Sequence, residues 1–240
     1  MMMYEENAGI YDLINQGIPY NKEARMLQCL LEKCDGKSLL DMACGTGKLI
    51  SYIDPFKYSI VGVDYSNGML HEARKNNRNR VKFFQGDMRD FSFDCKFNVV
   101  SCLGSAVQYN LTIEDLERTI VCLARHAINY MIFDVRYCLD KWIDGYVKDK
   151  WYEDLQYRVH ETWTSKREDV FSIWEPEFYV YNKLTGKESS YKDYHKIRLF
   201  SCNEIEEVLK NHGLKFSIVD VNLNECSNIK DVHFYYLITL

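Results

Sequence analysis

Short apolar runs alternate with amphipathic, helix-like segments over residues 1–140, and this alternation constrains the fold of the chain more than any other feature. The apolar runs predict strands over 37–42, 58–64, 81–85, 97–103 and 130–135. Strands that alternate with helices favour a parallel sheet with helices on both of its faces. We therefore expect an α/β, doubly wound fold whose binding crevice lies at the carboxyl ends of the strands.

Helix-start signals precede several of the amphipathic segments. Ser66 and Thr112 are each expected to cap a helix, because a hydroxyl oxygen can accept one of the first free backbone N–H groups. Ser201, with Glu204 three residues on, has the pattern of a capping box. The remaining predicted elements are an amphipathic helix over 21–33 and strands over 215–221 and 232–240.

The segment 137–200 differs in texture from the rest of the chain. It is rich in Tyr and Trp, and 171–174 and 177–181 alternate as strands do, with a turn signal at 182–187. Because no Pro- or Gly-rich linker bounds this segment, we expect an antiparallel insertion packed over the crevice. The chain is then a single domain over 1–240 with 137–200 as its cap.

Composition limits the partners of this chain. Its 30 basic and 35 acidic residues give a net charge of −5, which disfavours nucleic acid as the main partner. No apolar stretch approaches the roughly 18–20 residues that a membrane span needs. We therefore expect no nucleic acid and no membrane among its partners.

Cysteine usage indicates a reducing compartment. The nine cysteines are an odd number with no Cys-x-x-Cys pair, so neither a disulfide framework nor a zinc site is expected. Several lie inside apolar runs, where a reduced thiol behaves as a small hydrophobe. The acidic segment 1–6 lacks the features of a signal peptide. We predict a cytoplasmic protein without a metal site.

A glycine turn follows the first predicted strand, and we expect a helix directly after this turn. A phosphate-binding P-loop would need Gly where Met42 stands and Ser or Thr where Leu49 stands. A dinucleotide-binding turn would need Gly or Ala at Ile50, the position that permits close helix–strand packing. A third pattern fits, in which an acid precedes small residues at alternate positions: Asp41, Ala43, Gly45 and Gly47.

Two further acids close the next two strands. Asp64 lies about 20 residues after the turn, at the end of the second strand. A carboxylate at this position can accept hydrogen bonds from both hydroxyls of a ribose. Asp87, after Gly86, can accept the amino group of adenine. Because the carboxyl ends of parallel strands share one edge of the sheet, we expect these groups to meet at one ligand that carries adenosine.

Four segments, 41–47, 63–64, 86–91 and 97–109, resemble the class I S-adenosylmethionine-dependent methyltransferases. Within that family the chain is most similar to the N-methyltransferases of nucleotide-linked amino sugars. The further shared motifs are Tyr11-Asp12, Glu23-Ala24 and His195-x-x-x-Leu199-Phe200. The chain departs from the family in three places: Asp64 stands where Glu is usual, 133–137 replaces an aromatic run, and the stretch between Tyr11 and Glu23 is shorter.

The resemblance implies a fold and a cofactor. The fold would be a Rossmann-like, mostly parallel seven-stranded sheet with an antiparallel last strand, plus a small antiparallel β insertion. The cofactor would be S-adenosyl-L-methionine, with S-adenosyl-L-homocysteine as product. The implied cofactor-binding residues are Asp41, Ala43, Cys44, Gly45, Gly47, Asp64, Tyr65, Met69, Asp87, Met88 and Leu103.

The substrate side of the predicted site is formed by residues around the crevice mouth. Those expected to contact the substrate are Ser105, Gln108, Tyr109 and Arg136. Arg136 either binds a carboxylate or phosphate of the substrate or pairs with Asp134. The catalytic candidates are Tyr11, Tyr20 and His195. Either tyrosine would orient the amine or close over the methionine tail of the cofactor, or would only pack on the sheet.

The sulfonium of the cofactor already makes its methyl group electrophilic, so the protein mainly has to hold a nucleophile in line with the S–CH₃ bond. Such positioning supplies about 7–11 kcal/mol of the barrier. The leading hypothesis is N-methylation of a small amine by a monomer or homodimer. The alternatives are O-methylation, N-methylation of an amino-acid-like substrate and an idle cofactor-binding protein, with a dehydrogenase disfavoured by Ile50.

Overall fold

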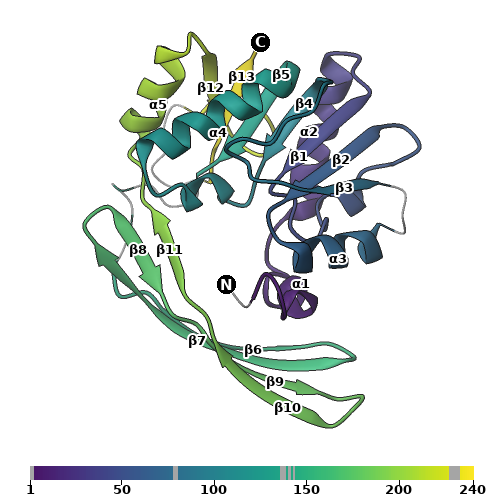
Figure 1. Ribbon diagram of the computed structural model, residues 1–240, viewed down its shortest axis with the longest axis vertical. Coiled ribbons are helices and arrows are strands. Elements are labelled where there is room, and N and C mark those ends of the chain that lie inside the picture. The colour runs from purple at the N-terminus through teal and green to yellow at the C-terminus, as the bar shows by residue number, and fades with distance from the viewer. Residues whose placement is uncertain (1–2, 78–80, 136–138, 140–141, 143, 227–232) are drawn as a thin grey trace.

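The computed structural model describes residues 3–77, 81–135, 139, 142, 144–226 and 233–240. Two sheets make up the molecule, and the N-terminal segment lies between them (Figure 1). The upper sheet is flanked by helices, and the lower sheet is a curved set of long strands (Figure 1). A ligand site at the carboxyl edge of the upper sheet therefore faces the N-terminal segment and the lower sheet.

The first sheet has seven strands in the order β12-β13-β5-β4-β1-β2-β3. Neighbours among β1 to β5 are parallel, whereas β13 runs antiparallel to both β5 and β12. This confirms the predicted doubly wound sheet with an antiparallel last strand. The strands are β1 (Ser38–Met42), β2 (Ser59–Asp64), β3 (Lys82–Gln85), β4 (Phe97–Cys102), β5 (Ala127–Asp134), β12 (Lys215–Val219) and β13 (Tyr235–Thr239).

The predicted helix starts are confirmed by their caps. Ser66 Oγ accepts the backbone N–H of Met69 at 3.1 Å, and Thr112 Oγ1 accepts that of Asp115 at 3.1 Å. Ser201 forms the complete capping box with Glu204. The helices are α1 (Tyr11–Ile14), α2 (Tyr20–Lys33), α3 (Asn67–Asn76), α4 (Ile113–His126) and α5 (Cys202–Asn211).

Strand alternation divides the core between the two faces of the sheet. Leu39 and its neighbours on one face pack with residues of α2 and α3, and Leu40 on the other face packs with residues of α4 and α5. Both leucines are fully buried. Replacing a buried leucine of this kind with alanine costs about 2–5 kcal/mol of stability. The sheet edge that carries the glycine turn is therefore rigidly supported from both sides.

The segment after the glycine turn differs from the prediction of a helix there. It contains only a short 3₁₀ turn, η2 (Ile50–Tyr52). Pro55 follows three residues later, and a proline disfavours the α conformation of the residue before it. A helix that began after Gly47 would thus have to end before Pro55.

The second sheet is antiparallel and lies between β5 and α5 in sequence. Its order is β10-β9-β7-β8-β11, with β6 also paired to β7. The turn predicted at 182–187 joins two of these strands. The strands are β6 (Val147–Glu153), β7 (Tyr157–Glu168), β8 (Phe171–Trp174), β9 (Glu177–Asn182), β10 (Lys187–Lys192) and β11 (His195–Arg198).

The N-terminal segment packs on the second sheet through its own apolar cluster. Met3, Ile10 and Ile14 are buried against Val159 and Phe178 of this sheet. A short 3₁₀ turn, η1 (Ala8–Ile10), precedes α1 within the segment. The second sheet thus positions the segment that faces the carboxyl ends of β1 to β4.

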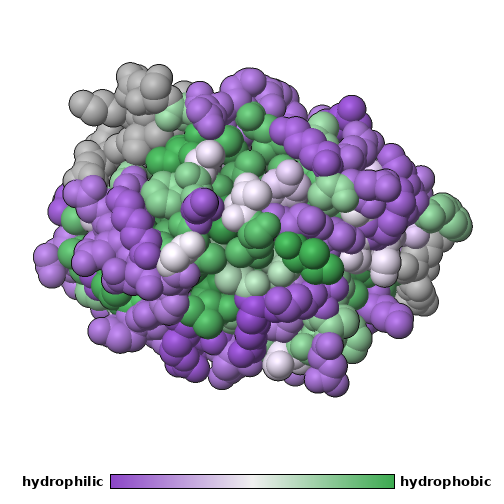
Figure 2. All heavy atoms as spheres, turned by 90° about the horizontal axis from the view of Figure 1, so that it is seen from above, coloured by the Kyte–Doolittle hydropathy of each residue, from purple (hydrophilic) through white to green (hydrophobic). Residues whose placement is uncertain are grey.

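The face of the molecule away from the second sheet carries both hydrophobic and hydrophilic residues. Figure 2, viewed from above Figure 1, shows hydrophobic residues gathered near the middle of this face and hydrophilic residues around them. Ile128 at the start of β5 and Leu240 after β13 are about half exposed. Among the helices that the structure describes, none is long and apolar enough to cross a membrane.

Candidate functional site

A cavity of about 490 Å³ opens at the carboxyl edge of β1 to β4. Its size is within the range of small-molecule sites. The strand ends form its floor, and the N-terminal segment and the start of α2 form its rim. The predicted site residues that line it are Tyr11, Tyr20, Asp41, Ala43, Cys44, Gly45, Asp64, Tyr65, Met69, Asp87, Met88, Leu103 and Tyr109.

The turn after β1 has the left-handed backbone that its small residues allow. Ala43 has φ 59° and Gly45 has φ 55°. Such a conformation is unusual for a residue with a Cβ, which makes Ala43 a strained position in the turn. A Cβ added to Gly45 would meet no atom within 4 Å. Gly45 itself lines the cavity, so a side chain at this position would extend into open space beside the cavity.

Gly47, which is predicted to bind the cofactor, has a packing role in the structure. It does not line the cavity, and an added Cβ would lie 2.6 Å from Asn77 Nδ2 and 3.2 Å from Ala73 Cβ. Its φ of 64° also favours glycine. Gly47 is thus required where the turn packs against α3.

Asp64 connects the end of β2 to two backbone segments. Its Oδ2 accepts the N–H of Gly45 at 2.8 Å, and its Oδ1 accepts the N–H of Ser66 at 2.9 Å. Burial raises the pKa of Asp64, and these backbone N–H groups oppose the rise. A carboxylate has about four lone-pair directions. The carboxylate thus keeps acceptor capacity for a hydroxyl donor in the cavity.

Two buried acids lie beneath the turn. Asp41 accepts a hydrogen bond from Ser101 Oγ at 2.7 Å, and burial raises its pKa to about 7. Glu23 of α2, which was not predicted as a site residue, also lines the cavity and is only 1% exposed. Its Oε1 accepts a hydrogen bond from the hydroxyl of Tyr235 at 3.0 Å. The ionised forms of these acids favour a cationic group in this part of the cavity.

One sequence signal could have identified Glu23. It lies directly before Ala24, on the face of the amphipathic helix that carries Leu27 and Leu30. A carboxylate on the apolar face of a helix is rarely buried without a specific use.

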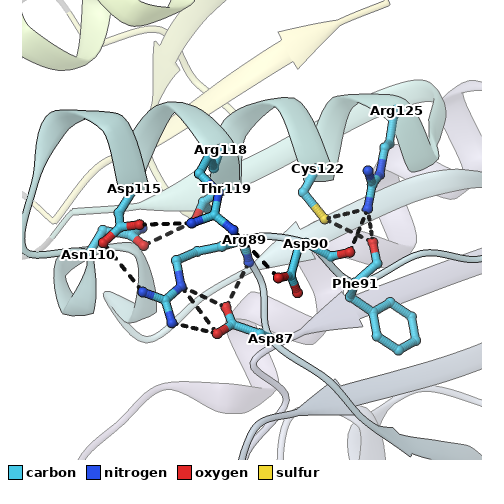
Figure 3. Close-up of polar contacts among 10 residues, drawn as sticks. All are labelled: Asp87, Arg89, Asp90, Phe91, Asn110, Asp115, Arg118, Thr119, Cys122 and Arg125. Carbon is cyan, nitrogen blue, oxygen red and sulfur yellow. Dashed lines mark hydrogen bonds and ion pairs between the residues drawn. The ribbon is translucent and has the colours of Figure 1, made fainter.

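Asp87 is held by an arginine two residues along the chain (Figure 3). Arg89 Nη2 lies 2.6 Å from Asp87 Oδ2, and Arg89 Nε lies 2.9 Å from Asp87 Oδ1. The guanidinium also reaches Asp115 of α4 at 3.3 Å. These contacts hold the pKa of Asp87 below its usual value. Arg89 also lines the cavity and was not predicted as a site residue. The amino group of an adenine bound at Asp87 would share the carboxylate with Arg89.

Helix α4 fixes the rest of this segment (Figure 3). Arg118 pairs with Asp90 at 3.5 Å, and Cys122 Sγ donates to the carbonyl oxygen of Phe91 at 3.2 Å. Arg125 donates to the same carbonyl oxygen. The loop that carries Asp87 is therefore anchored along its length.

Two predicted substrate contacts point away from the cavity. Ser105 donates from its backbone N–H and its hydroxyl to Asp134, at 2.7 and 3.1 Å. Gln108 is fully buried and donates to the carbonyl oxygen of Arg198 at 3.1 Å. Neither residue lines the cavity. Asp134 is itself fully buried, and its need for donors explains why Ser105 turns inward.

The catalytic candidates are divided in the same way. Tyr11 and Tyr20 line the cavity, whereas His195 lies behind it and is 5% exposed. His195 Nδ1 is 3.0 Å from the hydroxyl of Tyr109, which does line the cavity. Arg136 lies outside the described residues.

Tyr4 is a further lining residue that the sequence did not reveal. Its hydroxyl lies 2.7 Å from that of Tyr109, and its ring meets that of Tyr11 edge-on at 5.8 Å. No periodic pattern surrounds it, so no sequence signal distinguishes it from an exposed terminal residue.

The N-terminal segment that carries Tyr4 is bound to the start of α3 and to the glycine turn. Ser66 donates to the carbonyl oxygen of Tyr4, and a Cβ at Gly68 would lie 2.2 Å from the carbonyl oxygen of Glu5. Thr46 of the glycine turn donates to Asp12 at 2.5 Å. Only a glycine at position 68 permits the segment to approach α3 this closely.

Within the part of the chain that the structure describes, no three His, Cys, Asp or Glu side chains group as metal ligands. The cavity instead offers carboxylates and hydroxyls. Asp64 suits a pair of vicinal hydroxyls, the buried acids suit a cation, and the apolar Leu103 and Met69 suit a ring or an aliphatic chain. This donor set fits a nucleoside that bears a positively charged amino-acid tail.

Comparison with known proteins agrees with this fit. Residues 39–127 match the family model described as a methyltransferase domain. The chain is 29% identical, over 87% of its length and 84% of the relative, to dTDP-3-amino-3,6-dideoxy-alpha-D-glucopyranose N,N-dimethyltransferase of Streptomyces fradiae. It is also 29% identical to dTDP-3-amino-3,4,6-trideoxy-alpha-D-glucopyranose N,N-dimethyltransferase of Streptomyces venezuelae, over 91% of this chain and 94% of the relative. The crystal structure of Streptomyces venezuelae DesVI superposes with a TM-score of 0.82 at 25% identity, covering 97% of both chains.

Proposed function

We propose that this chain, which is an S-adenosylmethionine-dependent methyltransferase, methylates the amino nitrogen of a nucleotide-linked amino sugar. The observation that carries the proposal is one cavity that joins the glycine turn, Asp64 and a rim of tyrosines. Two of the relatives aligned along most of the chain are named as dimethyltransferases of dTDP-linked amino sugars. The cavity thus supports the cofactor part of the proposal, and the names of the relatives support the amine part.

The order of the strands gives the bound cofactor a direction. Asp87, after β3, would face the adenine, and Asp64, after the neighbouring β2, would hold the ribose. The methionine end would then extend over β1 towards β4, where Asp41 and Glu23 favour its ammonium group. The methyl group would lie beside Tyr109, which follows β4.

When bound, S-adenosylmethionine supplies a methyl group to the lone pair of the amine nitrogen, while the electron pair of the breaking C–S bond stays on sulfur. The protein has to exclude water and hold the nitrogen in line. The rings of Tyr4, Tyr11 and Tyr20 form walls that can do both. Positioning of this kind supplies about 7–11 kcal/mol of the barrier.

A second hollow supports the nucleotide part of the proposed substrate. It lies between the loop 15–19 and β6, and it shares Ile18 with the main cavity. Lys148 and Lys150 offer cations for phosphates there, and Tyr146 offers a ring for a base. Lys148 is already paired with Glu161 at 2.9 Å, so Lys150 is the stronger candidate.

The cytoplasm is the proposed location, with a monomer or a homodimer as the working form. All eight cysteines that the structure describes are free thiols, which suits a reducing compartment.

The test is a substrate panel with purified protein and S-adenosylmethionine. dTDP-linked 3-amino and 4-amino sugars are compared with free amino sugars, amino acids and phenols, and products are identified by mass spectrometry together with S-adenosylhomocysteine release. We expect N-methylated products from nucleotide-linked amino sugars, and a higher KM for these substrates in Lys150→Gln. Turnover of phenols or amino acids alone would replace the proposal with O-methylation or amino-acid N-methylation.

A further inference from the structure

A chain of polar side chains leads from the cavity into the second sheet. The hydroxyls of Tyr4 and Tyr109 are 2.7 Å apart, and the Tyr109 hydroxyl is 3.0 Å from His195 Nδ1. On the far side of the ring, His195 Nε2 is 3.6 Å from Asp193 Oδ2. The two tyrosines line the cavity, and the histidine and the aspartate are buried behind it.

We propose that Asp193 and His195 are positioning residues that set the direction of this chain, so that the Tyr4 oxygen accepts an N–H of the methyl acceptor. The proposal rests on the proposed function, because it concerns an amine acceptor. It assigns to His195 a role through Tyr109 rather than contact with the substrate.

The direction begins at Asp193. Its Oδ2 accepts the backbone N–H of Met3 at 2.9 Å, and its Oδ1 accepts that of Tyr194 at 2.8 Å, so the carboxylate is fixed. A carboxylate beside Nε2 favours the tautomer of His195 that carries its proton on Nε2. Nδ1 is then an acceptor, and the hydroxyl of Tyr109 has to donate to it.

The surroundings of His195 keep the ring neutral and fixed. Burial lowers its pKa to about 4, although the nearby Asp193 opposes this. The ring of Trp174 stacks on it with centroids 5.0 Å apart and planes at 9°. The ring of Tyr4 packs against it edge-on at 5.5 Å. A neutral ring in a fixed plane keeps its Nδ1 lone pair aimed at Tyr109.

The two hydroxyls carry this direction to the cavity. Because Tyr109 donates to His195, its oxygen accepts the hydroxyl proton of Tyr4. Burial raises the pKa of both phenols, so both stay protonated at neutral pH. With its proton committed to Tyr109, Tyr4 presents only lone pairs to the cavity.

An oxygen that can only accept selects and orients an amine. One N–H of the acceptor nitrogen donates to Tyr4, and the nitrogen lone pair then points away from Tyr4, towards the methyl group. A carboxylate or a phenolate has no hydrogen to donate and is disfavoured at the same point. Misplacement by about 1 Å costs on the order of 10²-fold in rate. A hydroxyl of fixed direction is thus a simple way to align the lone pair.

The first test reads the direction without activity. Nitrogen-15 NMR of labelled histidines, with the His195 signals assigned from a His195→Gln spectrum, reports which ring nitrogen is protonated. We expect a protonated Nε2 in the wild type and a shift of population towards protonated Nδ1 in Asp193→Asn. A protonated Nδ1 in the wild type overturns the proposal.

The second test separates positioning from binding. Asp193→Asn and Tyr4→Phe are each expected to lower kcat about 10- to 100-fold, with unchanged affinity for S-adenosylhomocysteine by calorimetry. The double variant should lose no more than Tyr4→Phe alone, because both changes act on one oxygen. Additive losses overturn the proposal. Tyr191→Phe is the matched control. Tyr191 belongs to the second sheet and its hydroxyl contacts Met3, but it is not part of the polar chain from Tyr4 to Asp193.

If Asp193→Asn does not fold, Tyr109→Phe interrupts the same chain at its middle and should give the same loss of kcat.

Two outcomes distinguish the positioning proposal from the proposed function. If the wild type methylates no amine, the proposed function fails and the role of Tyr4 as amine acceptor fails with it. Wild-type turnover of amines together with normal kcat in Tyr4→Phe overturns only the positioning proposal.

Discussion

The carboxylate of Asp64 accepts the backbone N–H of Gly45 at 2.8 Å, so the end of β2 holds the turn that follows β1. The same side chain accepts the N–H of Ser66 at the start of α3. One acid therefore determines the relative position of three elements around the cavity while facing the cavity itself.

Asp64→Asn should weaken the binding of S-adenosylhomocysteine. Asn has one acceptor oxygen in place of two, so it cannot accept from both backbone N–H groups and also from hydroxyls. Hydrogen bonds to a charged group contribute about 1.5–3 kcal/mol, which corresponds to roughly 10- to 100-fold in Kd. Calorimetry measures the change, with exposed Asp94→Asn as control. Equal affinity of Asp64→Asn and wild type would remove Asp64 from the ligand site.

Asp41→Asn should alter the pH dependence of stability. Burial raises the pKa of Asp41 to about 7 in the folded state, well above its value of about 4 in an unfolded chain. Between these values the folded state binds more protons than the unfolded state, so the free energy of unfolding decreases as the pH rises. Asn at this position stays uncharged and can still accept from Ser101.

Urea unfolding at several pH values tests this prediction. The variant should exceed wild type by on the order of 2–4 kcal/mol near pH 8, and the difference should disappear towards pH 4. Asp94→Asn again serves as control. Parallel pH curves for Asp41→Asn and wild type would show that Asp41 titrates normally.

Arg89→Gln should remove the support of Asp87. Because Arg89 holds the folded-state pKa of Asp87 below its unfolded value, the pair stabilises the protein above the unfolded pKa and loses this effect as the pH falls through the folded pKa. The pair is partly exposed, so we expect a loss of about 0.2–1 kcal/mol at neutral pH. Binding of S-adenosylhomocysteine should weaken as Asp87 becomes mobile.

Urea unfolding and calorimetry on the same preparation measure both effects. Arg118→Gln is the matched control, because Arg118 pairs with Asp90 and Asp115 but not with Asp87. A loss of affinity in Arg118→Gln as large as in Arg89→Gln would assign the effect to the loop as a whole.

Gly68→Ala should displace the N-terminal segment from α3. Its Cβ would lie 2.2 Å from the carbonyl oxygen of Glu5, a backbone atom that cannot rotate aside. We expect lower affinity for S-adenosylhomocysteine and a kcat reduced about tenfold or more, since Tyr4 moves with the segment. Gly9→Ala is the control in the same segment, because a Cβ there would meet only Glu72 Oε1, at an ordinary contact distance of 3.9 Å. Unchanged kinetics of Gly68→Ala would show that the segment does not position the substrate.

Local signals in the sequence predicted the strands of the first sheet and the starts of its helices. The caps at Ser66, Thr112 and Ser201 satisfy helix N–H groups of the same few residues, so short patterns predict them well. Strand alternation at Leu39 and Leu40 likewise predicts which face each residue takes. The prediction of a helix after Gly47 was wrong, because Pro55 disfavours the α conformation of the residue before it.

The sequence by itself determined the floor of the cavity, because parallel strands bring their carboxyl ends to one edge whatever the loops do. Asp41, Gly45, Asp64 and Asp87 therefore meet there, as their spacing predicts. Only the tertiary structure decided the rest. Arg89 engages Asp87, and the chain from Tyr4 to His195 joins segments far apart in sequence. Such contacts depend on how loops and the second sheet pack, which no local periodicity encodes.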